Sequence, residues 1–247
     1  TRFHLRKSNG LVRDVFYKRH MKQLLGTMGI GHTRYSTTGS TETNEVQPLY
    51  VNSPYGIMLA HNGHLTNATD LTEELIYKQQ RHINTISDTE ILLNVLAHEL
   101  QQESSELGLT PTMLFNSVKQ VFQRCHGGYA VVALISGHGL LAFRDPKGIR
   151  PLVIGRKKSD KKDAFMIASE SVALDAVDFE IIRDVAPGEA IFIDQDARMY
   201  TAMCSKQATL NPCLFEYIYM ARPDSVLDNI SIYQARLVMG QHLAKQI

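Results

Sequence analysis

The chain has 247 residues, of which 44% are hydrophobic, enough for a substantial core in one large domain or two modest ones. Its 26 basic residues balance 25 acidic residues, so no net field favours nucleic acid or an anionic membrane as a partner. No apolar run reaches the roughly 20 residues of a membrane span, and the sequence predicts a cytoplasmic protein whose partners are small molecules or other protein surfaces.

The first third of the chain is predicted to be mostly β. Apolar residues on both sides of Asn9-Gly10 predict a hairpin, and a short helix is expected at 17–25. The glycine-punctuated stretch at 29–39 is predicted to be a strand that passes into a polar loop. Two further strands are expected at 46–51 and 57–60.

Three helices are predicted in the middle of the chain. The first is expected to bury Leu71, Leu75 and Ile76 on one face. The second begins with Ser87 and Glu90 as a capping box, and the third begins at Thr110-Pro111, a cap followed by a first-turn proline.

After residue 128 the hydrophobic period changes from helical to extended. Short apolar runs separated by Gly, Pro and Asp turns predict a second sheet built mainly of hairpins, at 129–135, 140–143, 152–154, 165–168 and 190–193. The charge run at 156–162 is interpreted as a solvated loop between two of these strands.

The order strands, helices, strands does not repeat as βαβ, which argues against a doubly wound parallel sheet. We predict an α+β fold in which two antiparallel sheets pack together with helices outside. The spacing of apolar residues changes near 204–212, which predicts a linker there. It would join a domain at 1–203 to the beginning of a second domain at 213–247.

The cysteines are expected to be reduced thiols. Cys125, Cys204 and Cys213 are odd in number and contain no C-x-x-C pair, which argues against a disulfide framework and a self-contained zinc site. Cys125 falls on the apolar face of a predicted helix and is expected in the core.

Three local patterns suggest chemistry, although each also has a structural interpretation. Arg34 could be a surface charge, Asn62-Gly63 a common turn pair, and Asp88 an acid that complements a helix dipole. Taken together they suit one substrate. An arginine for a carboxylate, an aspartate for an ammonium, and an amide beside a glycine N–H for an oxyanion describe glutamine hydrolysis.

Several motifs resemble, in order and spacing, the glutamine phosphoribosylpyrophosphate amidotransferase family, which performs the first committed step of de novo purine biosynthesis. They are GHTRY at 31–35, LAHNG at 59–63, SDTE at 87–90, AFRDPKGIRPL at 142–152, ASES at 168–171 and YMARPDS at 219–225. The second and third are shared by class II glutamine amidotransferases generally, whereas the segment at 221–225 points to the purine enzyme.

The resemblance implies a four-layer αββα sandwich of the N-terminal-nucleophile hydrolase type, followed by the start of an α/β phosphoribosyltransferase domain. It implies that glutamine is hydrolysed to glutamate and ammonia, and that the ammonia passes to phosphoribosylpyrophosphate to give 5-phosphoribosylamine. Two alternatives stay open: another class II glutamine amidotransferase, and a non-catalytic glutamine-binding domain.

By the same resemblance, Arg34 holds the α-carboxylate of glutamine and Asp88 its α-amino group. Asn62 and Gly63 form the oxyanion hole.

The stretch from Arg34 to about Glu45 would be a mobile loop that closes over the substrate, with Tyr35 and Thr37 among the binding residues. Tyr219, and again Tyr35, would lie near the path of ammonia between the two sites.

The nucleophile of this family is a cysteine at the start of the mature chain, and none of the three cysteines matches its position. Thr1 is rejected as a substitute, because the segment 1–3 aligns with a later strand of the family. Thr1 in place of Met, and Ile247 inside a predicted helix, make both ends look like cuts. The polypeptide as printed is therefore expected to be inactive.

The resemblance also bears on cofactors and assembly. No cofactor or metal is expected in this chain, and magnesium is expected in the phosphoribosyltransferase part beyond it. Some members carry an iron–sulfur cluster, and Cys213 stands where one ligand would fall, but the interpretation without a cluster is preferred. A homotetramer with purine-nucleotide inhibition is expected.

Overall fold

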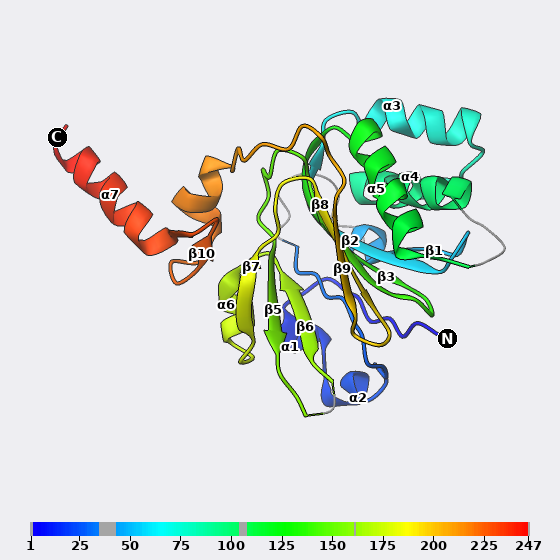
Figure 1. Cartoon of the computed structure of the whole chain (residues 1–247), viewed down its shortest axis with the longest axis horizontal. Coiled ribbons are helices and arrows are strands. Elements are labelled where there is room, and N and C mark those ends of the chain that lie inside the picture. Colours follow the sequence, from blue (N-terminus) through cyan, green and yellow to red (C-terminus); the bar gives the residue numbers. More distant parts are fainter. Residues whose placement is uncertain (1, 35–42, 104–107, 161, 247) are drawn as a thin grey trace.

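Two antiparallel sheets lie face to face at the centre of the molecule, and helices cover their outer faces (Figure 1). The structure is a computed structural model that describes residues 2–34, 43–103, 108–160 and 162–246.

The larger sheet has six strands among the described residues, and every pair of neighbours in it is antiparallel. In spatial order they are β1 (Leu49–Val51), β2 (Ile57–Leu65), β3 (Gly127–Ile135), β4 (Gly139–Arg144), β8 (Glu189–Asp194) and β9 (Met199–Met203). The smaller sheet has the order β6 (Ala164–Ala168), β5 (Val153–Lys157) and β7 (Glu180–Asp184), again antiparallel.

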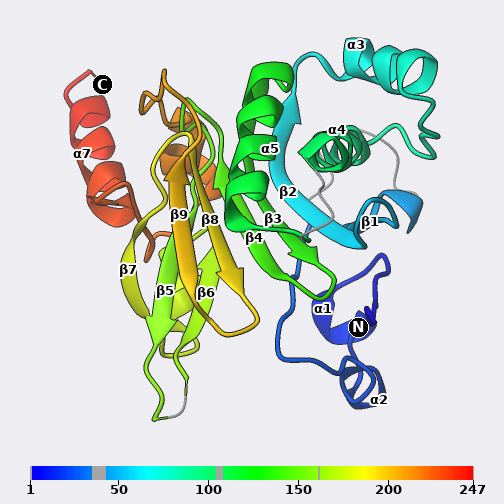
Figure 2. The same ribbon diagram turned by 45° about the vertical axis from the view of Figure 1, so that its right-hand side comes forward.

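Helices cover both outer faces of the sandwich. Three lie over the larger sheet, as Figure 2 shows: α3 (Ala68–Glu73), α4 (Asp88–Glu103) and α5 (Pro111–Arg124). On the far side of the smaller sheet, α6 (Ser171–Asp175) packs Leu174 against Gly155 of β5. No helix in the described part of the chain is both long and apolar enough to cross a bilayer.

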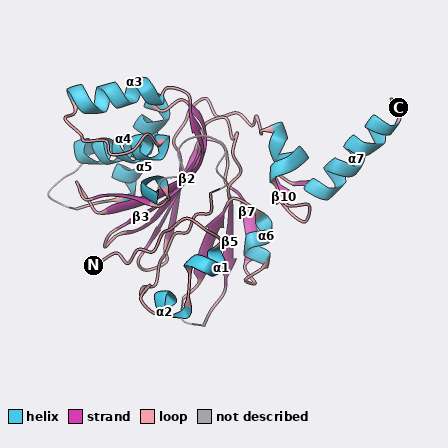
Figure 3. Cartoon of the chain, turned by 180° about the vertical axis from the view of Figure 1, so that it is seen from behind, coloured by secondary structure: helices cyan, strands magenta, loops and turns pink. Residues whose placement is uncertain are grey.

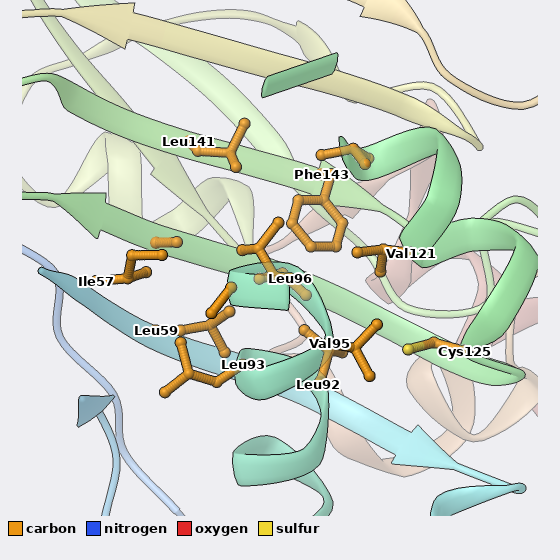
Figure 4. Packing of buried hydrophobic residues seen from close by; sticks show 14 of the residues in the cluster. Ile57, Leu59, Leu92, Leu93, Val95, Leu96, Val121, Cys125, Leu141 and Phe143 are labelled. Carbon is orange, nitrogen blue, oxygen red and sulfur yellow. The ribbon is translucent and has the colours of Figure 1, made fainter. Parts of the chain in front are cut away.

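Alternation along the strands gives the larger sheet two apolar faces, because successive side chains point to opposite sides. Tyr129 and Val131 of β3 pack with the helices, whereas Ala130 packs with the residues of the smaller sheet. Figure 4 shows the first core, where Leu92, Val95 and Leu96 of α4 and Val121 of α5 meet Leu59, Leu141 and Phe143. The predicted αββα order of layers is confirmed.

The N-terminal segment differs from the prediction. Instead of a hairpin, it contains two short helices, α1 (Val12–Val15) and α2 (Lys18–Met21), and residues 29–34 form neither helix nor strand. A single 3₁₀ turn (Thr43–Glu45) leads into β1. These segments lie beside the sandwich and do not extend its sheets. The predicted hairpin was wrong because it rested only on clusters of apolar residues around a turn signal.

The C-terminal segment leaves the sandwich after β9. It forms a π-helical turn (Glu216–Met220), a two-stranded hairpin of β10 (Val226–Leu227) and β11 (Ile230–Ser231), and then α7 (Ile232–Ala244). α7 points away from the sheets, and the two ends of the chain lie on opposite sides of the molecule (Figure 3).

Several local expectations can be compared directly. Cys125 is buried in the core, and Thr110 Oγ accepts a hydrogen bond from Met113 N as predicted for a cap. Only half of the predicted capping box forms, because Ser87 Oγ accepts a hydrogen bond from Thr89 N whereas the Glu90 carboxylate binds Thr85 and not the Ser87 backbone. Ile76, expected on the buried face of the first helix, is exposed. The runs at 129–193 do not form one sheet, since β3, β4 and β8 join β2 while β5 and β6 belong to the smaller sheet.

Candidate active site

The candidate site lies on β2, which is longer than the sequence predicted. The expected strand ends at residue 60, but β2 continues through Leu65 and pairs with β3 along its whole length. His61 shares the helix-facing side of the strand with Leu59, whereas Asn62 points to the opposite side. The turn-like pair Asn62-Gly63 therefore lies inside a strand.

The backbone at Gly63 excludes any other residue. Its φ is +153°, and a Cβ built there would lie 2.1 Å from the carbonyl oxygen of Gly128 and 2.7 Å from Cα of Tyr129. Glycine permits this approach because it has no side chain. The place of the Gly63 amide next to Asn62 is thus determined by the contact between β2 and β3.

Buried polar contacts fix His61. Its backbone N–H donates to Gln47 Oε1 at 2.7 Å, and its Nδ1 lies 2.8 Å from Thr89 Oγ1. Burial lowers the pKa of His61, although the nearby Asp88 carboxylate acts in the opposite direction. His61 is therefore neutral near pH 7 and ties β2 to the start of α4.

Asp88 is the first residue of α4 and lies against the end of β2. Its Oδ2 accepts a hydrogen bond from Leu65 N at 3.0 Å and lies 3.2 Å from His64 Nδ1 and 3.7 Å from His61 Nε2. All three contacts use one oxygen, and within the described ranges no partner is present for Oδ1. That oxygen is available for a cationic ligand.

Arg34 has a partner from its own chain. Its Nη1 lies 3.1 Å from Oε2 of Glu45, whose side chain is 4% exposed. A guanidinium carries five N–H donors in a planar fork, a geometry that can bind a second carboxylate besides Glu45. Glu45 had no binding role in the sequence analysis beyond marking the end of the loop.

His32 links the segment of Arg34 to β2 through a hydrogen bond to the backbone of His61. Burial, together with His61 and Arg34, lowers the pKa of His32 to about 4. A cavity of about 620 Å³ lies beside His32, between the N-terminal segment and the sheet, and neither Asn62 nor Asp88 lines it.

Asn62 has one strong contact. Nη2 of Arg150, in the loop between β4 and β5, donates to Asn62 Oδ1. Nη1 of the same arginine lies 2.8 Å from Oε1 of Glu216, the first residue of the C-terminal π-helical turn. The local sequence pattern assigned no role to Arg150 or Glu216. Each has apolar neighbours in the sequence, and a charged side chain in such a place usually needs an ion-pair partner when it is buried.

Two of the cysteines are unsuited to act as nucleophiles. Burial raises the pKa of the Cys125 thiol to about 12 and that of Cys204 to about 11, so neither forms a thiolate near neutral pH. Cys213 is half-buried, and its backbone N–H donates to Ile149 O. In the part of the chain with described coordinates, no group of three or more His, Cys, Asp or Glu residues is arranged to hold a metal ion.

The remaining predicted site residues are not all placed. Tyr35 and Thr37 lie outside the described residues. Tyr219 is 76% exposed on the π-helical turn, next to Met220, whose sulfur lies 3.5 Å from Arg150 Nη1. The linker at 204–212 runs alongside the loop after β4, where Thr209 N and Asn211 N donate to Pro146 O and Lys147 O. The domain boundary itself stays a prediction.

Comparison with known proteins gives a consistent result. A family described as a glutamine amidotransferase domain matches residues 32–176. The amidophosphoribosyltransferase of Pseudomonas aeruginosa is 54% identical over 246 residues, which are 100% of this chain and 49% of that protein. The enzyme of the same name from Escherichia coli is also 54% identical, over 99% of this chain and 48% of that protein.

A solved structure is similar as well. The glutamine phosphoribosylpyrophosphate amidotransferase from B. subtilis, in complex with ADP and GMP, aligns with a TM-score of 0.79 at 33% identity, over 96% of this chain and 48% of that one. The chain thus spans about half the length of the relatives that it matches.

Proposed function

Because the chain belongs to the glutamine amidotransferase domain family, we propose that it forms the glutaminase part of an amidophosphoribosyltransferase. The observation that carries this proposal is the assembly of Asn62, Gly63 and Asp88 at one end of β2, next to the segment of Arg34. The proposed reaction is hydrolysis of the glutamine side-chain amide to glutamate and ammonia.

Two charged residues hold the amino acid part of the substrate. The free oxygen of Asp88 binds the α-ammonium group, and the guanidinium of Arg34 binds the α-carboxylate. Charge-assisted hydrogen bonds of this kind are short and about twice as strong as neutral ones. They align the side-chain amide of glutamine along β2, towards Asn62.

The oxyanion of the tetrahedral intermediate is stabilised by the Asn62 side-chain amide and the Gly63 backbone N–H. Such donors act on charge that develops only during the reaction, and the loss of one donor typically costs roughly 100- to 1,000-fold in kcat.

The nucleophile is the thiolate of a cysteine other than the three in this chain, because raised pKa values exclude Cys125 and Cys204 and Cys213 does not match the position of the family's nucleophile. It attacks the amide carbon, ammonia leaves, and water then hydrolyses the thioester. A polypeptide with only the printed residues is accordingly proposed to be inactive in glutamine hydrolysis.

The second half-reaction uses the ammonia to displace pyrophosphate from phosphoribosylpyrophosphate, giving 5-phosphoribosylamine for purine synthesis. The similarity to named amidophosphoribosyltransferases over the whole chain supports this proposal. With it we propose a cytoplasmic homotetramer, magnesium at the phosphoribosyl-transfer site, and no iron–sulfur cluster at Cys213.

Replacement of Arg34 by Ala in the full-length enzyme tests the proposed binding site. We expect KM for glutamine to rise about 10- to 100-fold, because a hydrogen-bonded charge pair worth about 1.5–3 kcal/mol is lost. Synthesis of phosphoribosylamine from free ammonia should continue at the original rate. Arg198→Ala, on an exposed hairpin far from β2, serves as the control.

The two assays together separate the alternatives. Equal loss of glutamine- and ammonia-dependent synthesis, or loss of neither, contradicts the role of Arg34. Absence of any product with phosphoribosylpyrophosphate as acceptor would favour another class II amidotransferase, and absence of glutamine hydrolysis would favour a binding domain.

A further inference from the structure

Arg150 lies between the candidate oxyanion hole and the C-terminal segment. Its Nη2 donates to Asn62 Oδ1, and its Nη1 lies 2.8 Å from Glu216 Oε1. Its side chain is 14% exposed and that of Glu216 is 7% exposed. One guanidinium thus joins β2 to a residue that follows the sandwich in the sequence.

The contact with Asn62 determines how the amide is oriented. A guanidinium has donors and no acceptor, so only the oxygen of Asn62 can face it. The Nδ2 donor must then point away from Arg150. Without this contact the amide could rotate about its last torsion, which has a broad, roughly two-fold profile, and present its oxygen to a developing oxyanion.

The position of Arg150 depends in turn on Glu216. A buried charge needs a partner, and the loss of one member of a buried pair is costly. The carboxylate that pairs with the Arg150 guanidinium is that of Glu216, at 2.8 Å. The carboxylate of Asp145 accepts backbone N–H groups instead, including that of Arg150 itself. Burial raises the pKa of Glu216, and Arg150 opposes this rise.

A comparison with Arg144 shows that Arg150 is not simply a structural arginine. Arg144 is fully buried and donates to Arg150 O, Val185 O, Gly148 O and both carboxylate oxygens of Asp228. Those partners fix the loop after β4 and the β10–β11 hairpin. The Arg150 side chain instead joins a site residue, Asn62, to Glu216 and Met220 of the C-terminal segment.

We propose that Arg150 is a positioning residue that makes the oxyanion-binding orientation of Asn62 depend on the docking of the Glu216–Met220 turn onto the sandwich. The inference rests on the proposed glutaminase function. It follows that glutamine is hydrolysed efficiently only while the C-terminal segment is in place.

A double-mutant cycle in the full-length enzyme tests this coupling. Arg150→Met removes all donors while keeping a long side chain, and we expect it to lower kcat for glutamine about 10- to 100-fold with KM changed less than about twofold. On an Asn62→Ala background the same change should have almost no further effect, because the residue that Arg150 positions is already absent. Glu216→Leu should also lower kcat, and should have no effect once Arg150 is Met.

The readouts distinguish positioning from general damage. Ammonia-dependent synthesis in each variant reports whether the protein is folded, and Arg198→Met is the matched surface control. If Arg150→Met does not yield soluble protein, Glu216→Leu on the Asn62→Ala background provides the same comparison.

The inference is overturned if Arg150→Met lowers kcat for glutamine equally in the presence and absence of Asn62, or if it raises KM and leaves kcat unchanged. Either result leaves the proposed function intact. If Asn62→Ala itself hydrolyses glutamine at the normal rate, the proposed oxyanion hole fails, and this inference fails with it.

Discussion

Gly63 has a positive φ in the middle of a paired strand, and an added Cβ would overlap the Gly128 carbonyl oxygen. Asn62-Gly63 is typical of a hairpin turn in an isolated sequence. Here the pair stays in the strand because Gly127 on β3, where a Cβ would lie 2.1 Å from the carbonyl oxygen of His64, also lacks a side chain and lets the two backbones approach. The shape of the site therefore depends on glycines of two strands that are far apart in the sequence.

Replacement of Gly63 by Ala is expected to destabilise the fold by about 1–3 kcal/mol or more, because the added methyl must displace the backbone of β3. The rate of glutamine hydrolysis should fall by more than the loss of folded protein explains, because the substitution also moves the Gly63 backbone amide. Chemical denaturation and glutaminase assays measure the two effects. Gly29→Ala, where a Cβ meets nothing within 4 Å, is the control, and equal behaviour of the two variants would contradict the expectation.

The C-terminal hairpin and turn are held to the sandwich by charged contacts more than by apolar area. Glu170 accepts hydrogen bonds from Arg222 N and Ser225 Oγ, and Arg144 pairs with Asp228 through two hydrogen bonds of 2.7 and 2.9 Å. The motif at 219–225 thus contacts the motif at 168–171 through Glu170, and it contacts the motif at 142–152 through Arg150 and Met220. Their shared task is to attach the segment that follows the sandwich.

Asp228→Ala is expected to lower the free energy of unfolding by about 3–5 kcal/mol, because it leaves the charge of Arg144, which is 1% exposed, without its carboxylate partner. Asp224 provides a matched control, since its pair with Arg222 is exposed to solvent and contributes little to stability. Urea denaturation of the two alanine variants gives both values. A loss at position 228 no greater than at position 224 would show that the buried pair does not anchor the hairpin.

For the whole molecule, buried histidines make stability depend on pH. The native His32 has its pKa lowered to about 4, and burial lowers that of His61 as well. Between pH 6.5 and 4 the unfolded chain therefore binds more protons than the native one, and stability decreases as the pH falls through this window. Burial raises the pKa values of Asp145, Asp184 and Glu216, which act in the opposite direction.

Because these effects oppose one another, the contribution of His32 is measured by comparing the pH dependence of stability in a variant and in the parent protein. His32→Gln should reduce the slope of unfolding free energy against pH, between pH 6.5 and 4, by up to about 1.4 kcal/mol per pH unit relative to the parent protein. His242→Gln, on the exposed face of α7, is the control. Parallel curves for His32→Gln and the parent would disprove the role assigned to His32.

The layered architecture was predictable because strands buried on both faces, such as β3 and β4, are nearly continuous apolar runs. This signal is weak in the strands at the edges of the sheets. The residues of β7 are exposed along most of the strand and lack alternation, so β7 was missed. In the site, Asn62 and Asp88 could be identified from short motifs. Arg150 and Glu45 could not, because their roles arise only when the chain folds, Arg150 being 88 residues from Asn62.

The pairing of Arg144 with Asp228 has a consequence for the order in which the chain is made. On the ribosome, β4 emerges with its arginine 84 residues before the aspartate that neutralises it. Until then, packing of the two sheets would enclose an uncompensated charge. We therefore expect the sandwich to reach its full stability during translation only after the hairpin encoded beyond its last strand has emerged.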